Sequence, residues 1–468
     1  MLPNKHPSGA KAHVDIATFN VRAEARTLQS GHCRLSFLPL WWRRIIPLLE
    51  YAFLRRESLS RLGDSARLQL HLQGWIEMKL LIQAVAMLSV AMPFLLAAAY
   101  IPAARAQEVT EIGGEKLVTI SRAPVSTTNP EFTSITIAPG RGMEVIQITA
   151  NFPGKGNVNV LASPDLAGAK KMLDVDDTPN GDLGYRLGAA FLAPYPNRIR
   201  GKLSADGKTL TTEWQGHTLT LPANNIGKLP TAERHAMHGL ILKAKTDDVK
   251  VQNGTGGGVV TGTIHAGDFG GHWLSKTDLT INIRLTADNI DATVDAKNVG
   301  AEDEPMAIAW HPYFNLPSGD RSQVKVHIPA ETIAEVDGYD NVFPTGKISS
   351  VKGTRFDMRA PGGVALGTNF FDDNWNHIEW LNKNQEKVAT VTIVDPAAHY
   401  GVDIIGLSPD IRAIQMYAPP TSQFVAIEHQ YNFGDPFGKE WGSTNTGMVT
   451  LKPGQSTRWH VRLKVFVP

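Results

Sequence analysis

LTINIRLTADNIDATVDA, residues 279–296, is the stretch that decides the fold class. Apolar side chains fall on every second position from Leu279 to Leu285 and again from Ile290 to Ala296. The residues between these runs, Ala287-Asp288-Asn289, are typical of a turn. Successive side chains of a strand point to opposite faces, so this alternation predicts a β-hairpin with one buried face and one face toward water.

The same alternation recurs elsewhere in the chain. It runs from Trp459 to Val465 after the turn sequence Lys452–Gln455, and a shorter copy covers residues 324–328. No stretch after residue 106 shows a long, capped helical period, and no Ser-, Gly- or Pro-rich linker divides that part of the chain. Many short strands separated by turn residues are typical of a sandwich or barrel. We therefore predict an all-β protein, with one large antiparallel β-sandwich over residues 107–468.

The glycine-rich segment Asn253–Gly258 invites comparison with a phosphate-binding loop. It lacks the Lys-Ser/Thr ending and the following helix that such a loop needs in order to hold a phosphate group. A run of glycines between two strands is typical of a flexible hairpin loop, and we predict one there.

Residues 78–106 have the three parts of a secretory signal peptide. A charged start at Met78-Lys79 precedes the apolar stretch Leu80–Ile101 and a small-residue exit at Ala104-Arg105-Ala106. Cleavage after Ala106 predicts a periplasmic or secreted protein without stable membrane insertion, and an uncleaved anchor is the alternative. We expect the upstream residues 1–77 to be a start-site artefact, with a basic arm that contacts membrane or nucleic acid as the alternative.

Removing residues 1–106 changes the charge balance. The chain contains 46 Lys and Arg residues and 45 Asp and Glu residues. Residues 1–106 hold 13 of the basic and 6 of the acidic ones. The remainder therefore has 33 basic and 39 acidic residues, a net charge of −6. A mildly acidic domain offers no electrostatic basis for binding nucleic acid. The single cysteine, Cys33, also lies upstream, so residues 107–468 have no disulfide, thiolate nucleophile or cysteine-ligated metal.

Four groups of polar residues interrupt the strand pattern. They are Tyr195–Ile199, His235–Gly239, His311–Leu316 and Glu428-His429-Gln430. Each has a structural explanation when taken singly, because an Asn-Arg pair suits a solvated turn and a residue before proline is pushed to extended geometry. Their order along the chain and their composition favour a functional explanation instead.

In this order the groups resemble the aldose 1-epimerase (galactose mutarotase) family, from about Val145 to the C-terminus. The family's motifs appear as Asn197-Arg198-Ile199, His238-Gly239, His311-Pro312-Tyr313-Phe314-Asn315-Leu316, Pro344-Thr345-Gly346, Phe371-Asp372-Asp373-Asn374 and Glu428-His429-Gln430. The six-residue His-Pro-Tyr-Phe-Asn-Leu run is the specific match, whereas His-Gly and Pro-Thr-Gly are weak alone. The stretch 354–359 is also similar to a family motif.

The resemblance implies a galactose mutarotase-like sandwich that acts on a small-molecule sugar without metal or cofactor. It implies that Glu428 is the catalytic base and His311 the catalytic acid in opening and closing the hemiacetal ring. A positioned carboxylate and imidazole suit such proton transfers. For contacts to the sugar hydroxyls, the resemblance implies Asn197, Arg198, His238 and Asp372.

Two departures from the family pattern leave the sugar unassigned. Leu240 follows Gly239 where the family usually has a second glycine, and His429 stands where the family usually has proline. Both changes lie beside the expected site, so galactose is not assigned as the substrate. Phe371 and Trp375 either stack on a sugar face or belong to the core.

Three alternatives stay open, and the sequence does not indicate an oligomeric state. A non-catalytic carbohydrate-binding sandwich needs no paired Glu428 and His311. A metal enzyme would use histidines such as His235, His238 and His311. An epimerase of a phosphorylated sugar needs several cations beside the site, for which Arg198, Arg200 and Lys202 are the candidates.

Overall fold

The hairpin predicted at residues 279–296 is present. Strand β16 (Thr277–Leu285) pairs antiparallel with β17 (Ile290–Asn298), with Leu279 opposite Ala296 and Leu285 opposite Ile290. The apolar side chains of both strands are buried, and the side chains between them are mostly partly or fully exposed. The computed structural model describes residues 109–178, 180–227, 232–383 and 385–468. The expected signal peptide at 78–106 and the segment 1–77 therefore lie outside the described residues.

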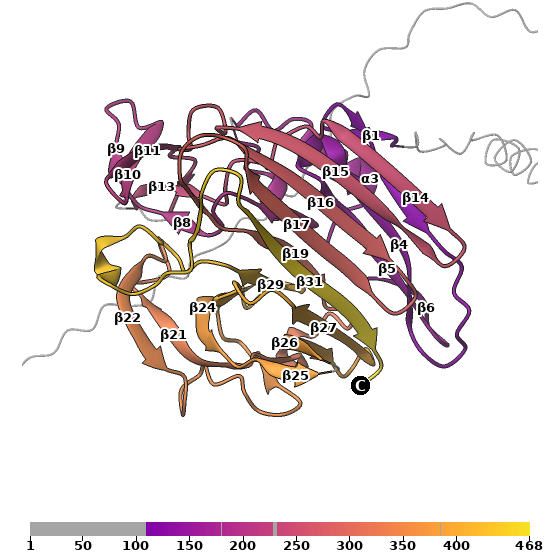
Figure 1. The fold of residues 1–468 in the computed structure, drawn as a ribbon. Coiled ribbons are helices and arrows are strands. Elements are labelled where there is room, and N and C mark those ends of the chain that lie inside the picture. The colour runs from indigo at the N-terminus through magenta and orange to yellow at the C-terminus, as the bar shows by residue number, and fades with distance from the viewer. Residues whose placement is uncertain (1–108, 179, 228–231, 384) are drawn as a thin grey trace, which may run out of the picture. The chain divides into compact units, whose positions relative to one another are not determined.

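The hairpin belongs to a ten-stranded antiparallel sheet (Figure 1). Strand β25 (Leu381–Lys383) pairs with β26, and the other strands follow the order β14 (Asp248–Gly254), β15 (Gly257–Gly267), β16, β17, β31 (Ser456–Phe466), β27 (Tyr400–Gly406), β26 (Glu386–Asp395), β20 (Lys325–His327) and β23 (Val364–Ala365). The alternation predicted near the C-terminus is confirmed, because Trp459 and Leu463 of β31 are fully buried.

An eleven-stranded antiparallel sheet packs against the first. Strand β6 (Gly156–Asn159) pairs with β5, and the other strands follow the order β22 (Pro344–Ser350), β21 (Ala330–Val336), β24 (Phe371–Ile378), β28 (Ala413–Ala418), β29 (Phe424–Gln430), β19 (Ala309–Asn315), β7 (Ala189–Leu192), β5 (Glu144–Phe152), β4 (Glu131–Ala138) and β3 (Val118–Ser121). The two sheets share one hydrophobic core, which includes Trp459 of β31 and Ile427 of β29. The structure is therefore the predicted all-β antiparallel sandwich.

Shorter elements complete the chain. The small sheets consist of β1 (Glu111–Ile112) with β2 (Glu115–Lys116), β9 (Lys202–Leu203) with β10 (Thr209–Trp214) and β11 (His217–Pro222), β8 (Arg198–Ile199) with β12 (Asn225–Ile226) and β13 (Arg234–Met237), and β18 (Glu304–Met306) with β30 (Val449–Leu451). The 3-10 helices are η2 (Pro139–Arg141), η3 (Gly184–Arg186), η4 (Arg321–Gln323) and η5 (Lys439–Trp441). Helix α3 (Leu166–Leu173) begins after Asp165, whose side chain accepts from Gly168 N at 2.7 Å.

The glycine-rich segment 253–258 forms the tight turn between β14 and β15, as predicted. Gly254 pairs with Gly257 at the end of the hairpin. Gly257 has φ +129°, and a Cβ at this position would lie 2.0 Å from the carbonyl oxygen of Leu285. Glycine is therefore required by the close approach of two backbones, which is a structural reason rather than a phosphate-binding one.

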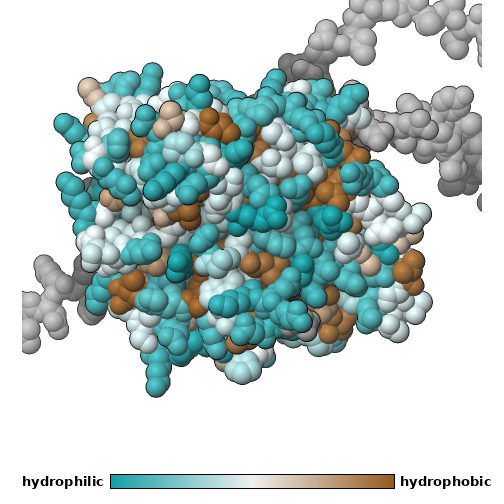
Figure 2. Space-filling view, in the orientation of Figure 1, coloured by the Kyte–Doolittle hydropathy of each residue, from teal (hydrophilic) through white to brown (hydrophobic). Residues whose placement is uncertain are grey.

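The face of the molecule seen in Figure 2 is mainly polar. In the view of Figure 2, hydrophilic side chains cover most of the face and hydrophobic ones lie in small separate groups. Among the residues that the structure describes, no helix is both long and apolar enough to cross a membrane.

Candidate active site

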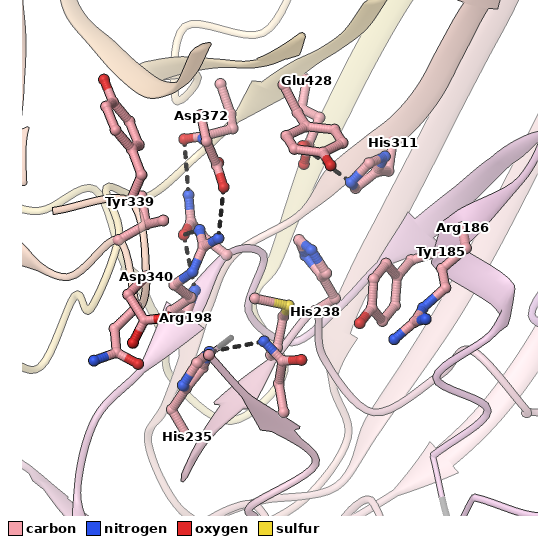
Figure 3. A pocket seen from close by; sticks show the side chains of 18 of the residues that line it. Tyr185, Arg186, Arg198, His235, His238, His311, Tyr339, Asp340, Asp372 and Glu428 are labelled. Atoms are coloured by element: carbon pink, nitrogen blue, oxygen red, sulfur yellow. Dashed lines mark hydrogen bonds and ion pairs between the residues drawn. The ribbon is translucent and has the colours of Figure 1, made fainter. Parts of the chain in front are cut away.

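The six residues predicted for the site line a single cavity of about 480 Å³ (Figure 3). Several strands and the loops next to them bring these side chains together from distant parts of the chain. Arg198 comes from β8, His311 from β19, Asp372 from β24 and Glu428 from β29, while Asn197 precedes β8 and His238 follows β13. The structure therefore supports the predicted grouping of the residues, while their chemical roles stay predictions.

Strand alternation explains why Glu428 faces the cavity. Its neighbours Ile427 and His429 are buried against the core on the other face of β29, and Trp459 Nε1 donates to the His429 carbonyl at 2.9 Å. Across the strand pair, Gln415 of β28 lies directly opposite Glu428 and also lines the cavity. The period of two that places His429 inside the sandwich thus places Glu428 and Gln415 outside the core.

A buried contact between His311 and Glu428 lies in the wall of the cavity. His311 Nε2 is 3.2 Å from Glu428 Oε1, and the two side chains are only 4% and 2% exposed. Gln430 Nε2 donates to Glu428 Oε2 at 2.8 Å and so fixes the orientation of the carboxyl group. The His311 ring stacks on Tyr313 at 4.8 Å and meets the His238 ring edge-on at 5.0 Å. These contacts hold an acid–base pair in one geometry.

Burial shifts the pKa values of Glu428 and His311 in opposite directions. It raises the pKa of Glu428 to about 8, to which the nearby Asp372 carboxylate also contributes. It lowers the pKa of His311 to about 4, and it lowers the pKa of His238 well below the ordinary value. A low-dielectric environment disfavours the charged form of each group. Without a sugar, burial therefore favours the arrangement in which the proton of the pair is on Glu428 and His311 is neutral.

A second polar cluster lies beside the pair. Arg198 NH2 donates to Asp372 Oδ2 at 2.9 Å, and Gln415 Nε2 donates to Asp372 Oδ1 at 2.8 Å. Asn197 accepts from Arg198 NH1 at 3.1 Å and donates to Gln415 Oε1 at 3.0 Å. Asn197 adopts φ +64°, a left-handed conformation that asparagine tolerates better than most residues. The network fixes the planar guanidinium at the wall of the cavity.

The cavity wall across from Arg198 and Asp372 contains residues that no sequence motif indicated. Tyr185 packs against His238 with ring centroids 4.6 Å apart, and the Arg186 guanidinium lies 5.6 Å from the centre of the Tyr185 ring. Aromatic residues complete the lining: Tyr313, Tyr339, Phe370, Tyr417 and Phe424. Tyr313 lies within the His-Pro-Tyr-Phe-Asn-Leu motif, whereas Tyr185 and Arg186 had no comparable pattern around them.

Phe371 and Trp375 belong to the core rather than to a sugar-stacking surface. Both side chains are fully buried, and neither lines the cavity. Trp375 Nε1 donates to the carbonyl of Phe356 at 2.9 Å. Of the two explanations that the sequence left open for these aromatics, the structural one is correct.

The possible metal ligands differ from the histidines considered in the sequence. His238, His311 and Glu428 each offer a ligand atom, and these atoms lie within 4.8 Å of one another. Zinc ligands in a tetrahedral site lie about 2.0–2.2 Å from the ion, so small movements would suffice to bind one. Both ring nitrogens of His235 are already engaged, one by Asn225 Nδ2 at 2.9 Å and one by a backbone carbonyl at 3.0 Å.

Comparison with known proteins agrees with the fold. The profile of the aldose 1-epimerase family matches residues 173–464. The chain belongs to the aldose 1-epimerase family.

Curated relatives match part of the chain. Galactose mutarotase of Homo sapiens is 26% identical over 141 residues, which cover 29% of this chain and 40% of the human protein. Galactose mutarotase of Bos taurus is 30% identical over 116 residues, which cover 24% of this chain and 33% of the bovine protein. The chain thus spans about two fifths or less of the length of these relatives.

Solved structures match the fold over a longer span. A galactose mutarotase-like protein from Clostridium acetobutylicum has a TM-score of 0.57 and 18% identity, covering 75% of this chain and 98% of that chain. An aldose epimerase homologue from C. elegans has a TM-score of 0.55 and 17% identity, covering 75% of this chain and 99% of that chain. At these identities the likeness shows the fold alone.

Proposed function

We propose that the protein is an aldose 1-epimerase, which interconverts the α and β anomers of a free aldose by opening and closing the hemiacetal ring. The observation that supports this most directly is the buried contact of 3.2 Å between His311 Nε2 and Glu428 Oε1. The two oxygens that exchange protons in this reaction, O1 and the ring oxygen O5, are bonded to the same carbon. The acid and the base must therefore converge on one point, as this pair does.

The reaction needs two proton transfers in each direction. Glu428, as the base, takes the proton of the C1 hydroxyl while His311, as the acid, gives a proton to O5. The C1–O5 bond breaks and the open-chain aldehyde forms. After rotation about the C1–C2 bond, the C5 hydroxyl attacks the other face of the aldehyde, returning its proton to His311 while Glu428 reprotonates O1. No proton, electron or atom is gained or lost, so no co-reactant is needed.

Burial favours the ring-opened stage of this cycle. In that stage Glu428 carries a proton and His311 is neutral, which is the state favoured by a Glu428 pKa of about 8 and a His311 pKa of about 4. Sugar hydroxyls that donate to Glu428 lower its pKa again when the ring is closed, because hydrogen bonds to a carboxylate favour its charged form. Glu428 can thus act as a base when the closed ring is bound and as an acid when the open-chain sugar is bound.

The Arg198–Asp372 network orients the sugar rather than moving protons. Arg198 and Asp372 lie on the cavity wall, held by Asn197 and Gln415. The cavity of about 480 Å³ lies within the ordinary range for small-ligand sites. Fixing the ring relative to the acid and base converts binding energy into correct orientation. The role of these residues as hydroxyl partners is part of this proposal.

The three cations considered for a phosphorylated sugar are either paired or outside the cavity. Arg198 is paired with Asp372. Arg200 lies 3.5 Å from Glu233 and packs over Phe343, and it does not line the cavity. Lys202 is exposed on β9, also outside the lining. None of the three offers a free charge to a phosphate in the cavity.

Polarimetry of freshly dissolved aldoses tests the proposed activity. The purified protein should speed the approach to the equilibrium rotation, and the rate should survive a metal chelator. Loss of the rate to the chelator would favour the metal alternative, with His238, His311 and Glu428 as ligands. No acceleration with any aldose, together with measurable sugar binding, would favour the non-catalytic carbohydrate-binding alternative.

We also propose export with removal of residues 1–106, on the basis of the signal-like stretch 78–106. N-terminal sequencing of the exported protein should begin at Gln107. A sequence that began within residues 1–77 would contradict both the cleavage and the start-site hypotheses.

A further inference from the structure

Arg186 differs from the other arginine in the cavity because its charge is not neutralised. It ends η3 and lines the cavity, and its side chain is exposed. Among the described residues, no carboxylate lies within ion-pair distance of its guanidinium, whereas Arg198 is paired with Asp372 at 2.9 Å. Asp182 acts on Arg186 electrostatically, but its carboxylate is buried and accepts from Asn224 Nδ2 at 2.6 Å.

A chain of ring contacts connects Arg186 to the acid–base pair. Arg186 lies over Tyr185, the Tyr185 and His238 rings are 4.6 Å apart, and the His238 and His311 rings are 5.0 Å apart. Figure 3 shows these residues on one side of the pocket, with Arg198, Asp372 and Tyr339 on the other. The uncompensated positive charge is therefore on the His311 side of the cavity.

The geometry of an aldohexose ring indicates which substituent reaches that side. This step rests on the proposed function, in which His311 contacts O5. The carbon C5 carries both O5 and the exocyclic carbon C6, so the group at C6 lies next to O5. With O5 at His311, the ring can be oriented so that the C6 group lies along the wall formed by Tyr185, toward Arg186. In this orientation, which is part of the inference, the hydroxyls on C2 and C3 face Arg198 and Asp372 on the other side.

We propose that the substrates include hexuronates, aldoses with a carboxylate at C6, and that Arg186 binds this carboxylate. The planar guanidinium of arginine forms paired hydrogen bonds with a carboxylate, and such charge-assisted bonds are stronger than neutral ones. Around this position the His311–Glu428 pair carries no net charge and the Arg198–Asp372 pair is neutral. Asp340 also lines the cavity, on the side of Arg198 and Tyr339 and away from Arg186. The Arg186 guanidinium, which has no carboxylate within ion-pair distance among the described residues, therefore matches one carboxylate, whereas a phosphate dianion calls for a larger cluster of donors.

Matched sugar pairs test this assignment by polarimetry. D-Galacturonate with D-galactose, and D-glucuronate with D-glucose, differ only at C6. The ratio of kcat/KM for the uronate to that for the neutral sugar should exceed one in at least one pair. Arg186→Gln should lower this ratio by about tenfold or more, the size expected for loss of a hydrogen-bonded charge, and Arg186→Lys should lower it less. Lys202→Gln removes a charge of the same sign outside the cavity and should leave the ratio unchanged.

The outcomes separate this inference from the proposed function. A ratio that Arg186→Gln leaves unchanged, or faster reaction of neutral sugars alone, overturns the inference while the epimerase activity stands. A merely structural role of Arg186 lowers both rates together and so also leaves the ratio unchanged. A higher kcat/KM for D-glucose 6-phosphate than for D-glucuronate overturns the carboxylate assignment. Acceleration of no sugar at all overturns the proposed function and this inference with it.

Discussion

Burial shifts the pKa values of Glu428 and His311 in opposite directions. In the proposed reaction, the two pKa values together set the pH range for activity. Below about pH 4 His311 gains a proton while Glu428 keeps its own, so the pair has no base. Above about pH 8 Glu428 loses its proton while His311 stays neutral, so the pair has no acid. We expect kcat/KM, measured by polarimetry across this range, to be bell-shaped with limbs near these values.

The structure reverses the simplest expectation for the two limbs. Ordinary pKa values assign the acidic limb to Glu428 and the alkaline limb to His311. Burial exchanges these assignments, because it raises the pKa of Glu428 above that of His311. A profile whose alkaline limb survived the change Glu428→Gln in a partly active variant would contradict the exchanged assignment.

Gln430 gives a second prediction at the scale of one residue. Its Nε2 donates to Glu428 Oε2 at 2.8 Å, and this hydrogen bond lowers the Glu428 pKa. Gln430→Leu removes the donor, so the Glu428 pKa should rise and the alkaline limb should move to higher pH. We also expect kcat/KM to fall by about tenfold, because the carboxylate loses its fixed orientation. Gln323→Leu, at an exposed position on η4, is the matched control for both readouts.

Motifs in the sequence were sufficient to group six residues that share one cavity, and their roles stay predictions. All six residues taken from these motifs line one cavity. The motifs were recognisable because each contains a polar residue in an otherwise apolar setting. Gln415, Tyr185 and Arg186 were missed because they have no such pattern around them. Gln415 reaches the cavity only through the pairing of β28 with β29, and Arg186 only through the position of η3. These placements depend on contacts between segments that are far apart in the chain.

Strand β29 illustrates how one element places cavity-lining and core side chains on opposite faces. Glu428 and His429 are neighbours in sequence but occupy opposite faces, and burial lowers the pKa of His429 to about 4. His429→Leu should therefore leave the polarimetric rate within a few-fold of the wild type, because a neutral core side chain is replaced by another. A loss of rate as large as that caused by changes at Glu428, with an unchanged circular dichroism spectrum, would show that His429 takes part in catalysis.

Local elements were easier to predict than their pairing. The hairpin of β16 and β17 follows from alternation and a turn within residues 279–296. The pairing of β17 with β31, which places Ile290 opposite Leu463, joins segments far apart in the sequence and has no local pattern. Helix α3 was not predicted, since its eight residues are too few to show a helical period.

Buried titratable groups make the stability of the whole molecule depend on pH. Burial raises the pKa of Glu304 to about 7 and lowers that of His235 to about 4. A raised carboxyl pKa contributes stability that is full below the unfolded value and is lost as pH rises through the folded value. A lowered histidine pKa contributes stability that is present above the unfolded value and is lost as pH falls through the folded value. We expect the Tm to be highest at mildly acidic pH, roughly 5 to 6.

Glu304 offers a direct check of this stability profile. Its carboxyl group is fully buried and accepts from Thr277 Oγ1 at 2.9 Å, away from the cavity. Glu304→Gln keeps an acceptor for Thr277 and removes the ionisation, so the decline in Tm as pH rises from about 4.5 through 7 should become shallower. Glu302→Gln, the same change at a nearby exposed residue, should leave the profile as it is. An equal decline in both variants would show that Glu304 does not contribute.

The central claim is that Glu428 and His311 transfer the protons of ring opening and closure, and the polarimetric rate of Glu428→Gln tests it most directly. This change keeps the shape and hydrogen-bonding reach of the side chain but removes its ability to accept a proton. The rate should fall by roughly 10²–10⁴-fold with the fold unchanged by circular dichroism. Adding His311→Asn should cost little more, because residues that act as a unit are not additive. A folded Glu428→Gln variant with a near-wild-type rate of mutarotation would contradict the account.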